Sequence, residues 1–451
     1  MDRGGRMDRR EMVRATGAAL AAMGPGGRML RREGSRPESA APDSWRVNGD
    51  RVNGWLTELS RFGANPEGGV SRVGFSEADR AARAWLEPIM RGAGLEVSTD
   101  PAGNMIGRRP GSDPSLKPLL FGSHIDSVLH GGNYDGDVGT LAAVEVARTL
   151  KEQGYRNRHP FWVTMWADEE SGLTGSRGFL GDIGAEELAR PDPRDGATLA
   201  EKIRRVGGDP EAMATYRNEP GSIAGYVELH IEQGGILEES GTDIGVVEGI
   251  VGIRSWNVVV SGFANHAGTT PMPGRKNALL AASELALAVD RIVKARPGRQ
   301  VGTVGRFEVR PGASNVIPGE VSMSIEIRDL SMDNLDALWV EIERAGTEIM
   351  ASRGTTWTVQ PKATNVAALS TPAVRDRIAD AARSLGLSAR VMPSGAGHDA
   401  QDLARIGPMG MIFVPSVGGI SHSPKEFTRP ADVTNGANVL LQTMLRLDGM
   451  P

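Results

Sequence analysis

Apolar runs and amphipathic runs alternate along most of the chain. The apolar runs have the length and character of buried strands, and we predict four of them at residues 119–121, 161–167, 226–231 and 411–414. Between the first two runs, apolar residues recur four positions apart and predict one face of a crossover helix: Val138, Ala142, Val146 and Leu150. This alternation is typical of βαβ units, so the sequence predicts an α/β fold around a mainly parallel sheet.

The pattern changes near Gly249. The elements predicted from there are a strand at 253–263, a helix at 277–293, strands at 302–310 and 321–330, a helix at 332–350 and a strand at 355–360. The order β-α-β-β-α-β is that of the ferredoxin-like motif. The α/β alternation resumes near Val366. The sequence therefore predicts a larger α/β domain in two parts, 46–248 and 366–451, with a small ferredoxin-like α+β domain inserted at 249–365.

Residues 1–45 differ from the rest of the chain. Nine arginines and no lysine fall before position 40, around a short apolar stretch at residues 17–23. Arg9-Arg10 ahead of this stretch resembles a twin-arginine export signal, although a second basic pair, Arg31-Arg32, follows it. Two interpretations stay open. The segment directs export to the periplasm, or the protein is cytoplasmic and residues 1–45 are an unstructured tail or follow an early start codon.

Composition narrows the function classes. The 451 residues include 51 Lys and Arg against 56 Asp and Glu, a net charge of −5 that argues against nucleic acid as the main partner. No apolar run reaches the ~18 residues of a membrane-spanning helix. The absence of cysteine excludes disulfides, thiolate metal sites and a cysteine nucleophile. Any metal must therefore be held by carboxylates and by some of the seven histidines.

Polar side chains follow two of the predicted strands. The run at 119–121 leads into Gly122-Ser123-His124-Ile125-Asp126, and Asp135 comes eleven residues after His124. The run at 161–167 leads into Asp168-Glu169-Glu170. Open α/β sheets bind ligands beyond the carboxyl ends of their strands, so we expect the two clusters to meet in space. A group of acids at one place is costly unless cations compensate it.

Two further histidines lie at strand ends. The alternation around His230 predicts a polar face with Glu228, His230 and Glu232 and a core face with the residues between them. His422 follows the run at 411–414. Three imidazoles and two carboxylates are what two divalent ions require when one carboxylate bridges them, and the sequence offers five such side chains: His124, Asp135, Glu170, His230 and His422. Asp126 is placed to orient His124 from behind.

Six segments together resemble one family. They are 122–127, 131–136, 169–170, 230–234, 266–272 and 314–318. The chain is similar to the amidase/hydantoinase/carbamoylase branch of the M20 metallopeptidase superfamily over roughly residues 47 to 446. Members of this branch include N-carbamoyl-L-amino-acid hydrolases, allantoate and ureidoglycolate amidohydrolases, and β-ureidopropionases. Asp137 departs from the family pattern, in which a small apolar residue is commoner.

The resemblance implies an amidohydrolase with two divalent ions in each subunit. It implies that zinc, or manganese, cobalt or nickel, is held with Asp135 as the bridging ligand, His124 and His230 on one ion, and Glu170 and His422 on the other. The two ions together would lower the pKa of the water between them and polarise the scissile carbonyl. The implied reaction is cleavage of the C–N bond of an N-carbamoyl (ureido) amino acid or related ureido acid.

The resemblance also assigns roles to residues beyond the ligands. Glu169 would be the general base, taking a proton from the bridging water and giving it to the leaving nitrogen. His266 would stabilise the tetrahedral oxyanion. Four further residues match substrate contacts: Gln233 for an amide, Asn315 and Arg328 for the carboxylate, and His398 near the substrate. The inserted domain would act as a lid and pair two subunits into a homodimer, with His266 acting on either its own site or the facing one.

Competing functions remain to be weighed. Residues 395–400 satisfy a loose dinucleotide-binding pattern but lack the acid ~20 residues later. No Gly-x-Ser-x-Gly, Walker or His-Glu-x-x-His sequence is present. The nearest alternative is an M20 aminoacylase or dipeptidase that cuts N-acyl amino acids or peptides. A metal-binding protein without turnover is disfavoured because all five ligands and Glu169 are present.

Overall fold

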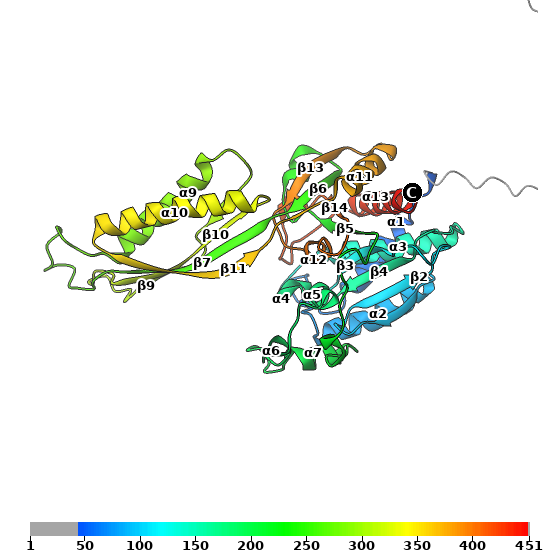
Figure 1. Ribbon diagram of the computed structural model, residues 1–451, viewed down its shortest axis with the longest axis horizontal. Coiled ribbons are helices and arrows are strands. Elements are labelled where there is room, and N and C mark those ends of the chain that lie inside the picture. The colour runs from blue at the N-terminus through cyan, green and yellow to red at the C-terminus, as the bar shows by residue number, and fades with distance from the viewer. Residues whose placement is uncertain (1–43, 450–451) are drawn as a thin grey trace, which may run out of the picture. The chain divides into compact units, whose positions relative to one another are not determined.

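The protein is described by a computed structural model over residues 44–449, which contains two separate β-sheets (Figure 1). The twin-arginine pair therefore lies outside the described residues. None of the helices within 44–449 is long and apolar enough to cross a membrane. The larger sheet has nine strands in the order β1-β2-β4-β3-β5-β14-β6-β12, with β13 paired to β6. Their bounds are β1 Glu96–Thr99, β2 Met105–Arg109, β3 Leu119–His124, β4 Phe161–Trp166, β5 Gly225–Ile231, β6 Ile244–Ile250, β12 Ala368–Leu369, β13 Ala389–Ser394 and β14 Met409–Val414.

The four predicted buried strands form the centre of this sheet. Strands β4, β3, β5 and β14 are neighbours and run parallel, so their carboxyl ends lie at one edge. The outer strands β2 and β6 join them antiparallel. The expected α/β fold with a mainly parallel sheet is confirmed. One detail differs: β5 is buried on both faces, with Glu228 fully buried and His230 almost so, whereas its alternation predicted a polar face.

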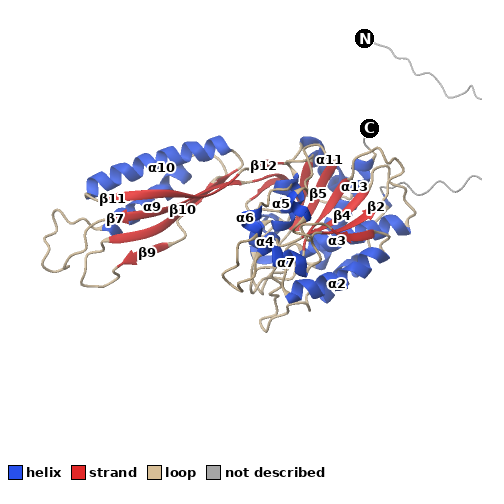
Figure 2. Cartoon of the chain, turned by 60° about the horizontal axis from the view of Figure 1, so that its bottom comes forward, coloured by secondary structure: helices blue, strands red, loops and turns tan. Residues whose placement is uncertain are grey.

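Helices cover both faces of the larger sheet (Figure 2). Leu119 and Phe121 of β3 pack into one core, and Leu120 packs into the other. The first core is closed by α1 (Gly49–Leu59), α2 (Glu77–Gly92), α3 (Asp137–Glu152), α11 (Pro372–Ser384) and α13 (Pro430–Asp448). The second is closed by α5 (Thr174–Leu180), α8 (Ile236–Ser240) and α12 (Asp399–Leu403). Short helices α4 (Glu169–Gly172), α6 (Ala185–Leu188) and α7 (Leu199–Arg205) follow β4.

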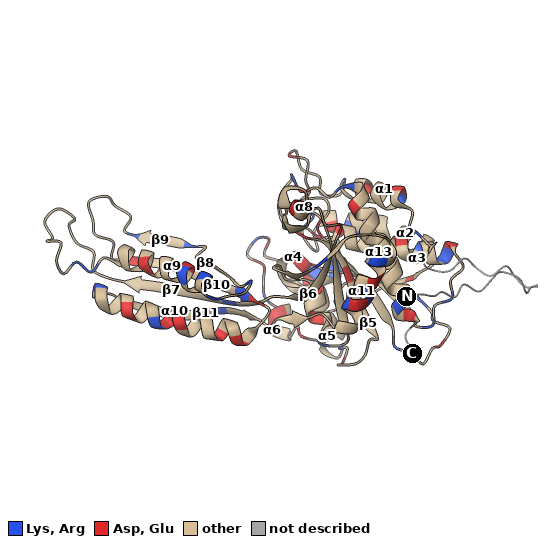
Figure 3. Ribbon diagram, turned by 90° about the horizontal axis from the view of Figure 1, so that it is seen from above, with Lys and Arg blue, Asp and Glu red and all other residues tan. Residues whose placement is uncertain are grey.

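The second sheet is antiparallel throughout and has its own core. Its order is β11-β7-β10-β8, with β9 also paired to β10. The strands are β7 Gly252–Ser261, β8 Val301–Thr303, β9 Phe307–Arg310, β10 Glu320–Asp329 and β11 Thr356–Asn365. Helices α9 (Ala278–Ala295) and α10 (Met332–Arg353) pack on it through residues such as Leu285 and Leu338. Acidic and basic residues are interspersed along α10 (Figure 3). The run predicted as one strand at 302–310 is split into β8 and β9.

Within residues 44–449, the chain passes between the two sheets at two places. Strand β6 ends at Ile250 and β7 begins at Gly252, so one residue separates them. On the return, β11 ends at Asn365 and β12 begins at Ala368. We refer to the part between these crossings as the lid.

Candidate metal centre

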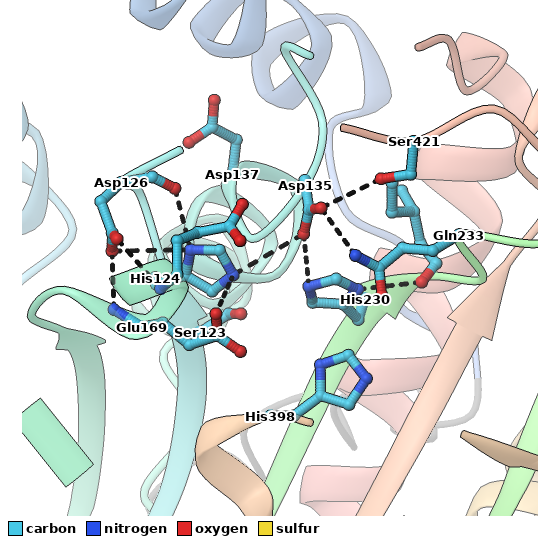
Figure 4. A network of polar contacts seen from close by, with 12 residues as sticks. Ser123, His124, Asp126, Asp135, Asp137, Glu169, His230, Gln233, His398 and Ser421 are labelled. Atoms are coloured by element: carbon cyan, nitrogen blue, oxygen red, sulfur yellow. Dashed lines mark hydrogen bonds and ion pairs between the residues drawn. The ribbon is translucent and has the colours of Figure 1, made fainter. Parts of the chain in front are cut away.

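Asp135 lies where the predicted ligands converge (Figure 4). Its loop follows β3, and its carboxylate meets the side chains at the ends of β3 and β5. The Nε2 atom of His230 lies 2.9 Å from Asp135 Oδ1, and that of His124 lies 3.7 Å from the same oxygen. One ligand atom from each of these three residues lies within 4.8 Å of the others. The structure thus brings together His124 and His230, which are 106 positions apart in the chain, beyond the carboxyl ends of β3 and β5.

The two imidazoles are oriented from behind by the main chain. Nδ1 of His124 lies 3.0 Å from the carbonyl oxygen of Asp126, and Nδ1 of His230 lies 2.9 Å from that of Ile231. When Nδ1 donates to these carbonyls, the lone pair of Nε2 faces Asp135, the arrangement typical of metal-binding histidines. Both buried Nε2 atoms lack a hydrogen-bond partner, even though His230 Nε2 is within reach of Asp135. Both Nε2 atoms thus point toward Asp135 Oδ1, with that of His230 at ion-pair distance.

The pKa values of His124 and His230 shift in opposite directions. Burial lowers the pKa of His124 to about 4. Burial acts on His230 in the same direction, but the closer Asp135 carboxylate outweighs it and raises the pKa of His230 to about 9. Asp135 is itself buried, yet the imidazoles around it hold its pKa well below the usual range. An anionic carboxylate between two imidazoles is suited to a divalent cation.

A second group shares Asp135. Nε2 of His422 lies 3.3 Å from Asp135 Oδ2 and 3.4 Å from Glu170 Oε2. One ligand atom from each of these three residues again lies within 4.8 Å of the others. His422 has a positive φ of 51° and a half-exposed side chain, so this side of the centre is open to solvent. Burial raises the pKa of Glu170 to about 7, and the nearby Asp135 adds to this effect.

Glu169 lies beside the first group without belonging to either. Its Oε2 is 3.9 Å from His124 Nε2. Burial raises the pKa of Glu169 well above its usual range, and the carboxylates of Asp399, Glu170 and Asp135 add to it. The Asp126 carboxylate accepts hydrogen bonds from the backbone N–H groups of Glu169 and Glu170, at 3.1 and 3.2 Å. The carboxylate of Asp126 therefore fixes the two glutamates, and its main-chain carbonyl orients His124.

Glu426 was not predicted from the sequence, although it holds the Asp135 loop. Its Oε1 accepts hydrogen bonds from the backbone N–H groups of Tyr134 and Asp135, at 2.9 and 3.0 Å. Its Oε2 accepts one from Ser421 Oγ at 2.7 Å, and Ser421 also bonds Asp135 Oδ2 at 3.1 Å. The only signal in the sequence is its position four residues after His422.

Arg72 is a second residue that the sequence did not reveal. It is fully buried, and its Nη2 lies 2.6 Å from Asp137 Oδ2. Its other donors bond the carbonyls of Ile125, Leu59 and Phe62. Ile125 lies between His124 and Asp126, so Arg72 joins the loop after β3 to the start of α3. Asp137, which departs from the expected pattern, thus faces this buried guanidinium.

Three predicted substrate contacts lie close to the centre. Gln233 Nε2 donates to Asp135 Oδ2 at 2.7 Å, and its buried Oε1 has no partner. His398 is buried against His230, with ring centroids 4.5 Å apart, and its Nε2 lies 2.8 Å from Ser394 Oγ. Arg328 is on β10 and donates from Nη1 to the Gly395 carbonyl at 2.7 Å.

The remaining predicted contact, Asn315, lies with the predicted oxyanion residue His266 at the other end of the lid. Arg328 pairs with Ile253 next to the crossing, whereas Glu320, at the far end of β10, pairs with Ser261. His266 follows Ser261 and forms a bridge with Val316, and Ala267 N–H donates to the Asn315 carbonyl at 2.9 Å. The eight residues between positions 320 and 328 of β10 span about 27 Å. His266 and Asn315 are therefore together, and Arg328 is far from both within one lid.

The tautomer of His266 is fixed by its own loop. Its Nδ1 accepts hydrogen bonds from the N–H groups of Gly268 and Thr269, at 3.0 and 3.1 Å. An Nδ1 that accepts two donors leaves the proton on Nε2, so the exposed edge of the neutral ring is a hydrogen-bond donor.

Comparison with known proteins identifies the family. Residues 119–446 match the family described as Peptidase family M20/M25/M40. The chain belongs to this family and, by its relatives, to the hydantoinase/carbamoylase branch. It is 39% identical over 406 residues to an N-carbamoyl-L-amino acid amidohydrolase of Geobacillus stearothermophilus, covering 89% of this chain and 99% of that protein.

Two further relatives extend the comparison. A ureidoglycolate hydrolase of Arabidopsis thaliana is 36% identical over 417 residues, covering 89% of this chain and 87% of that protein. The crystal structure of an amidase of the hydantoinase/carbamoylase family from Burkholderia multivorans superposes with a TM-score of 0.85. That structure is 35% identical, and the match covers 90% of this chain and all of the other.

Proposed function

We propose that this protein is a metal-dependent amidohydrolase that cleaves a C–N bond in the ureido group of N-carbamoyl amino acids or related ureido acids. The observation that carries the proposal is the convergence on Asp135 of three imidazoles and a second carboxylate, with an unligated, buried Glu169 beside them. The similarity over nearly the full length to an N-carbamoyl-L-amino acid amidohydrolase and to a ureidoglycolate hydrolase supports the same reaction.

We assign two divalent cations to the centre. His124, Asp135 and His230 would hold one, and Asp135, Glu170 and His422 the other. The partnerless Nε2 atoms of His124 and His230 fit this assignment, because a buried acceptor without a partner is otherwise costly. Nitrogen and oxygen donors suit zinc, manganese, cobalt or nickel. When bound, such ions polarise the scissile carbonyl and lower the pKa of the attacking water.

Glu169 is the general base in this proposal. Its Oε2 faces the centre near His124, so it can accept a proton from the attacking water and later return it to the leaving nitrogen. Glu170 lies beside His422 and is assigned as a metal ligand, so it does not act as the general base. Gln233 offers its partnerless Oε1 to a ureido N–H, and His398 supports the ring of His230. Asp126 keeps both glutamates in place.

In this proposal the lid of one subunit contributes residues to the active site of a second copy of the chain. Residues 249–365, of which the first two still belong to β6, form the lid and dimerisation domain in this proposal, and residues 46–248 and 366–451 form the catalytic domain. Arg328 would bind the substrate carboxylate in its own subunit, exchanging its present contacts with Glu326 and the Gly395 carbonyl for the bidentate fork. A single lid cannot bring His266 and Asn315 to the same small substrate, since they lie about 27 Å along the sheet from Arg328. We therefore assign these two residues to the site of the partner in a homodimer.

Ammonia release tests the reaction. We expect the protein to release ammonia from N-carbamoyl-L-methionine faster than it releases free methionine from N-acetyl-L-methionine. Chelation should abolish turnover, and reconstitution with zinc, manganese, cobalt or nickel should restore it, with weaker metal binding at lower pH because the ligands must be deprotonated. Preference for the N-acetyl compound would identify an aminoacylase instead. Full turnover in excess chelator would contradict the metal assignment.

Mixing two inactive variants tests the composite site. His266→Ala alone should lower kcat by about 10²- to 10³-fold, the loss expected for one oxyanion donor. Glu169→Gln dimers and His266→Ala dimers that exchange subunits should recover about a quarter of wild-type activity, because half the dimers are mixed and each has one intact site. No recovery after verified exchange would show that His266 acts in its own subunit.

A further inference from the structure

A cleft of about 480 Å³ opens beside the metal centre. Ser421 and His422 form its wall on the side of Asp135. Gly395, whose carbonyl binds Arg328, also lines it. The cleft therefore touches both the proposed metal ligand His422 and the loop that holds the proposed carboxylate-binding Arg328. Its volume falls in the range of about 300–1,000 Å³ that is typical of small-molecule sites.

Most polar side-chain atoms around this cleft are already bonded to the protein, and the exception, Gln233 Oε1, is the atom assigned to the ureido group. Glu232 accepts hydrogen bonds from the N–H groups of Ile236 and Leu237, both at 2.8 Å. Gln233 Nε2 and Ser421 Oγ both donate to Asp135. These groups face the metal centre or their own backbone, so they offer little to a polar substituent placed deeper in the cleft.

The remaining wall is apolar or small. It consists of Ile236, Met392, Pro393, Gly395, Ala396 and Gly419, which we call the side-chain cleft. Met392 is buried, but Ile236 is 45% exposed, so the isoleucine has surface left for a ligand to cover. A hydroxyl or amide placed against this wall would lose its water without gaining a partner, whereas an apolar group would gain from burial.

We propose that the side-chain cleft holds the side chain of the substrate and selects N-carbamoyl amino acids with apolar side chains the size of methionine or leucine. This inference rests on the proposed function. It places a hydroxyl-bearing ureido acid such as ureidoglycolate, and an N-carbamoyl amino acid with a charged side chain, among the poor substrates. One missing or mismatched group in such a pocket changes kcat/KM by about 10- to 200-fold.

Gly395 allows the cleft to be filled without disturbing the fold. Its φ lies outside the left-handed region, and a Cβ added there would meet no atom within 4 Å. Gly395→Val should lower the ratio of kcat/KM for N-carbamoyl-L-methionine to kcat/KM for N-carbamoylglycine, which has no side chain, by at least about 10-fold. Ile236→Ser should act in the same direction by removing the apolar wall. Gly397→Val is the matched control, because Gly397 lies outside the cleft and its added Cβ meets only Gln401 Oε1 at 3.7 Å.

The wild-type comparison uses N-carbamoyl-L-methionine, N-carbamoylglycine, N-carbamoyl-L-aspartate and ureidoglycolate. Preference for the methionine compound, lost in both cleft variants and kept in Gly397→Val, supports the proposal. Equal losses on the methionine and glycine compounds, or no loss on either, overturn it while leaving the proposed function standing. If the wild type cleaves only N-acyl compounds, the proposed function fails, and the same variants are then compared on N-acetyl-L-methionine and N-acetylglycine. Absence of turnover on both classes overturns both proposals.

Discussion

Replacing Glu169 by glutamine is expected to lower kcat by about 10²- to 10⁴-fold, the contribution typical of a general base. The amide keeps the size of the side chain and the backbone hydrogen bond to Asp126, but it cannot accept a proton at the position of Oε2. None of the five proposed ligands changes, so the variant should still bind two ions. Steady-state kinetics together with metal analysis of the same sample measure both effects.

The control is Glu187→Gln. Glu187 is on α6 and pairs with Arg177 at 2.7 Å, away from the metal centre, so its loss should leave kcat unchanged. In the metal-free protein, Glu169→Gln should not lower the thermal midpoint, because burial and nearby carboxylates already raise the pKa of Glu169 and disfavour its charge. A fully metallated Glu169→Gln protein that works at the wild-type rate would contradict the assignment.

Asp137→Leu is expected to lower the free energy of unfolding by about 3–5 kcal/mol, since it leaves the buried Arg72 guanidinium without its anionic partner. Both side chains are almost fully buried, at 1% and 2% exposure, so water cannot replace the carboxylate. The same change should weaken metal binding, because Arg72 also holds the carbonyl of Ile125 beside His124. Urea unfolding in the presence of chelator measures the first effect, and titration with zinc measures the second.

A double variant distinguishes the effect of an unpaired buried charge from the effect of the change in side-chain shape. Arg72→Met with Asp137→Leu should be less destabilised than Asp137→Leu alone, because no buried charge is left unpaired. The recovery should be partial, since the carbonyls of Leu59 and Phe62 lose their donor. The exposed pair Arg80–Glu77 serves as the control, and Glu77→Leu should change stability little. Equal losses in the single and double variants would show that the ion pair has no special role.

The apolar pattern predicted the centre of the larger sheet well, for a physical reason. Strands β3, β4, β5 and β14 are buried on both faces, so their sequences are nearly continuous apolar runs. Strands β6 and β13 were not predicted. Two glycines and Glu248 interrupt β6, and β13 contains Arg390 and Pro393 and is exposed at its start. In β6, which is largely buried, the glycines and Glu248 break the apolar run, whereas β13 carries a weak pattern because only part of it is buried.

The candidate ligands were predictable because histidines are few and lie at strand ends, whose positions the fold class fixes. Arg72 and Glu426 were not, because their partners are 65 and 291 residues away in the chain, at Asp137 and Asp135. No local spacing encodes such contacts. The separation of His266 from Arg328 was also hidden, since it depends on the register of β7 with β10 and not on the type of either residue.

The two crossings between the sheets are short, so a rotation at the crossings moves the far end of the lid over a large distance. Only Val251 separates β6 from β7, and two residues separate β11 from β12, so the long strands transmit any turn at these points without a flexible loop to absorb it. A turn of about 10° there displaces the end of a ten-residue strand by about 5 Å, more than the length of a hydrogen bond. Small changes in packing around residues 251 and 366–367 are thus magnified at the imidazole of His266.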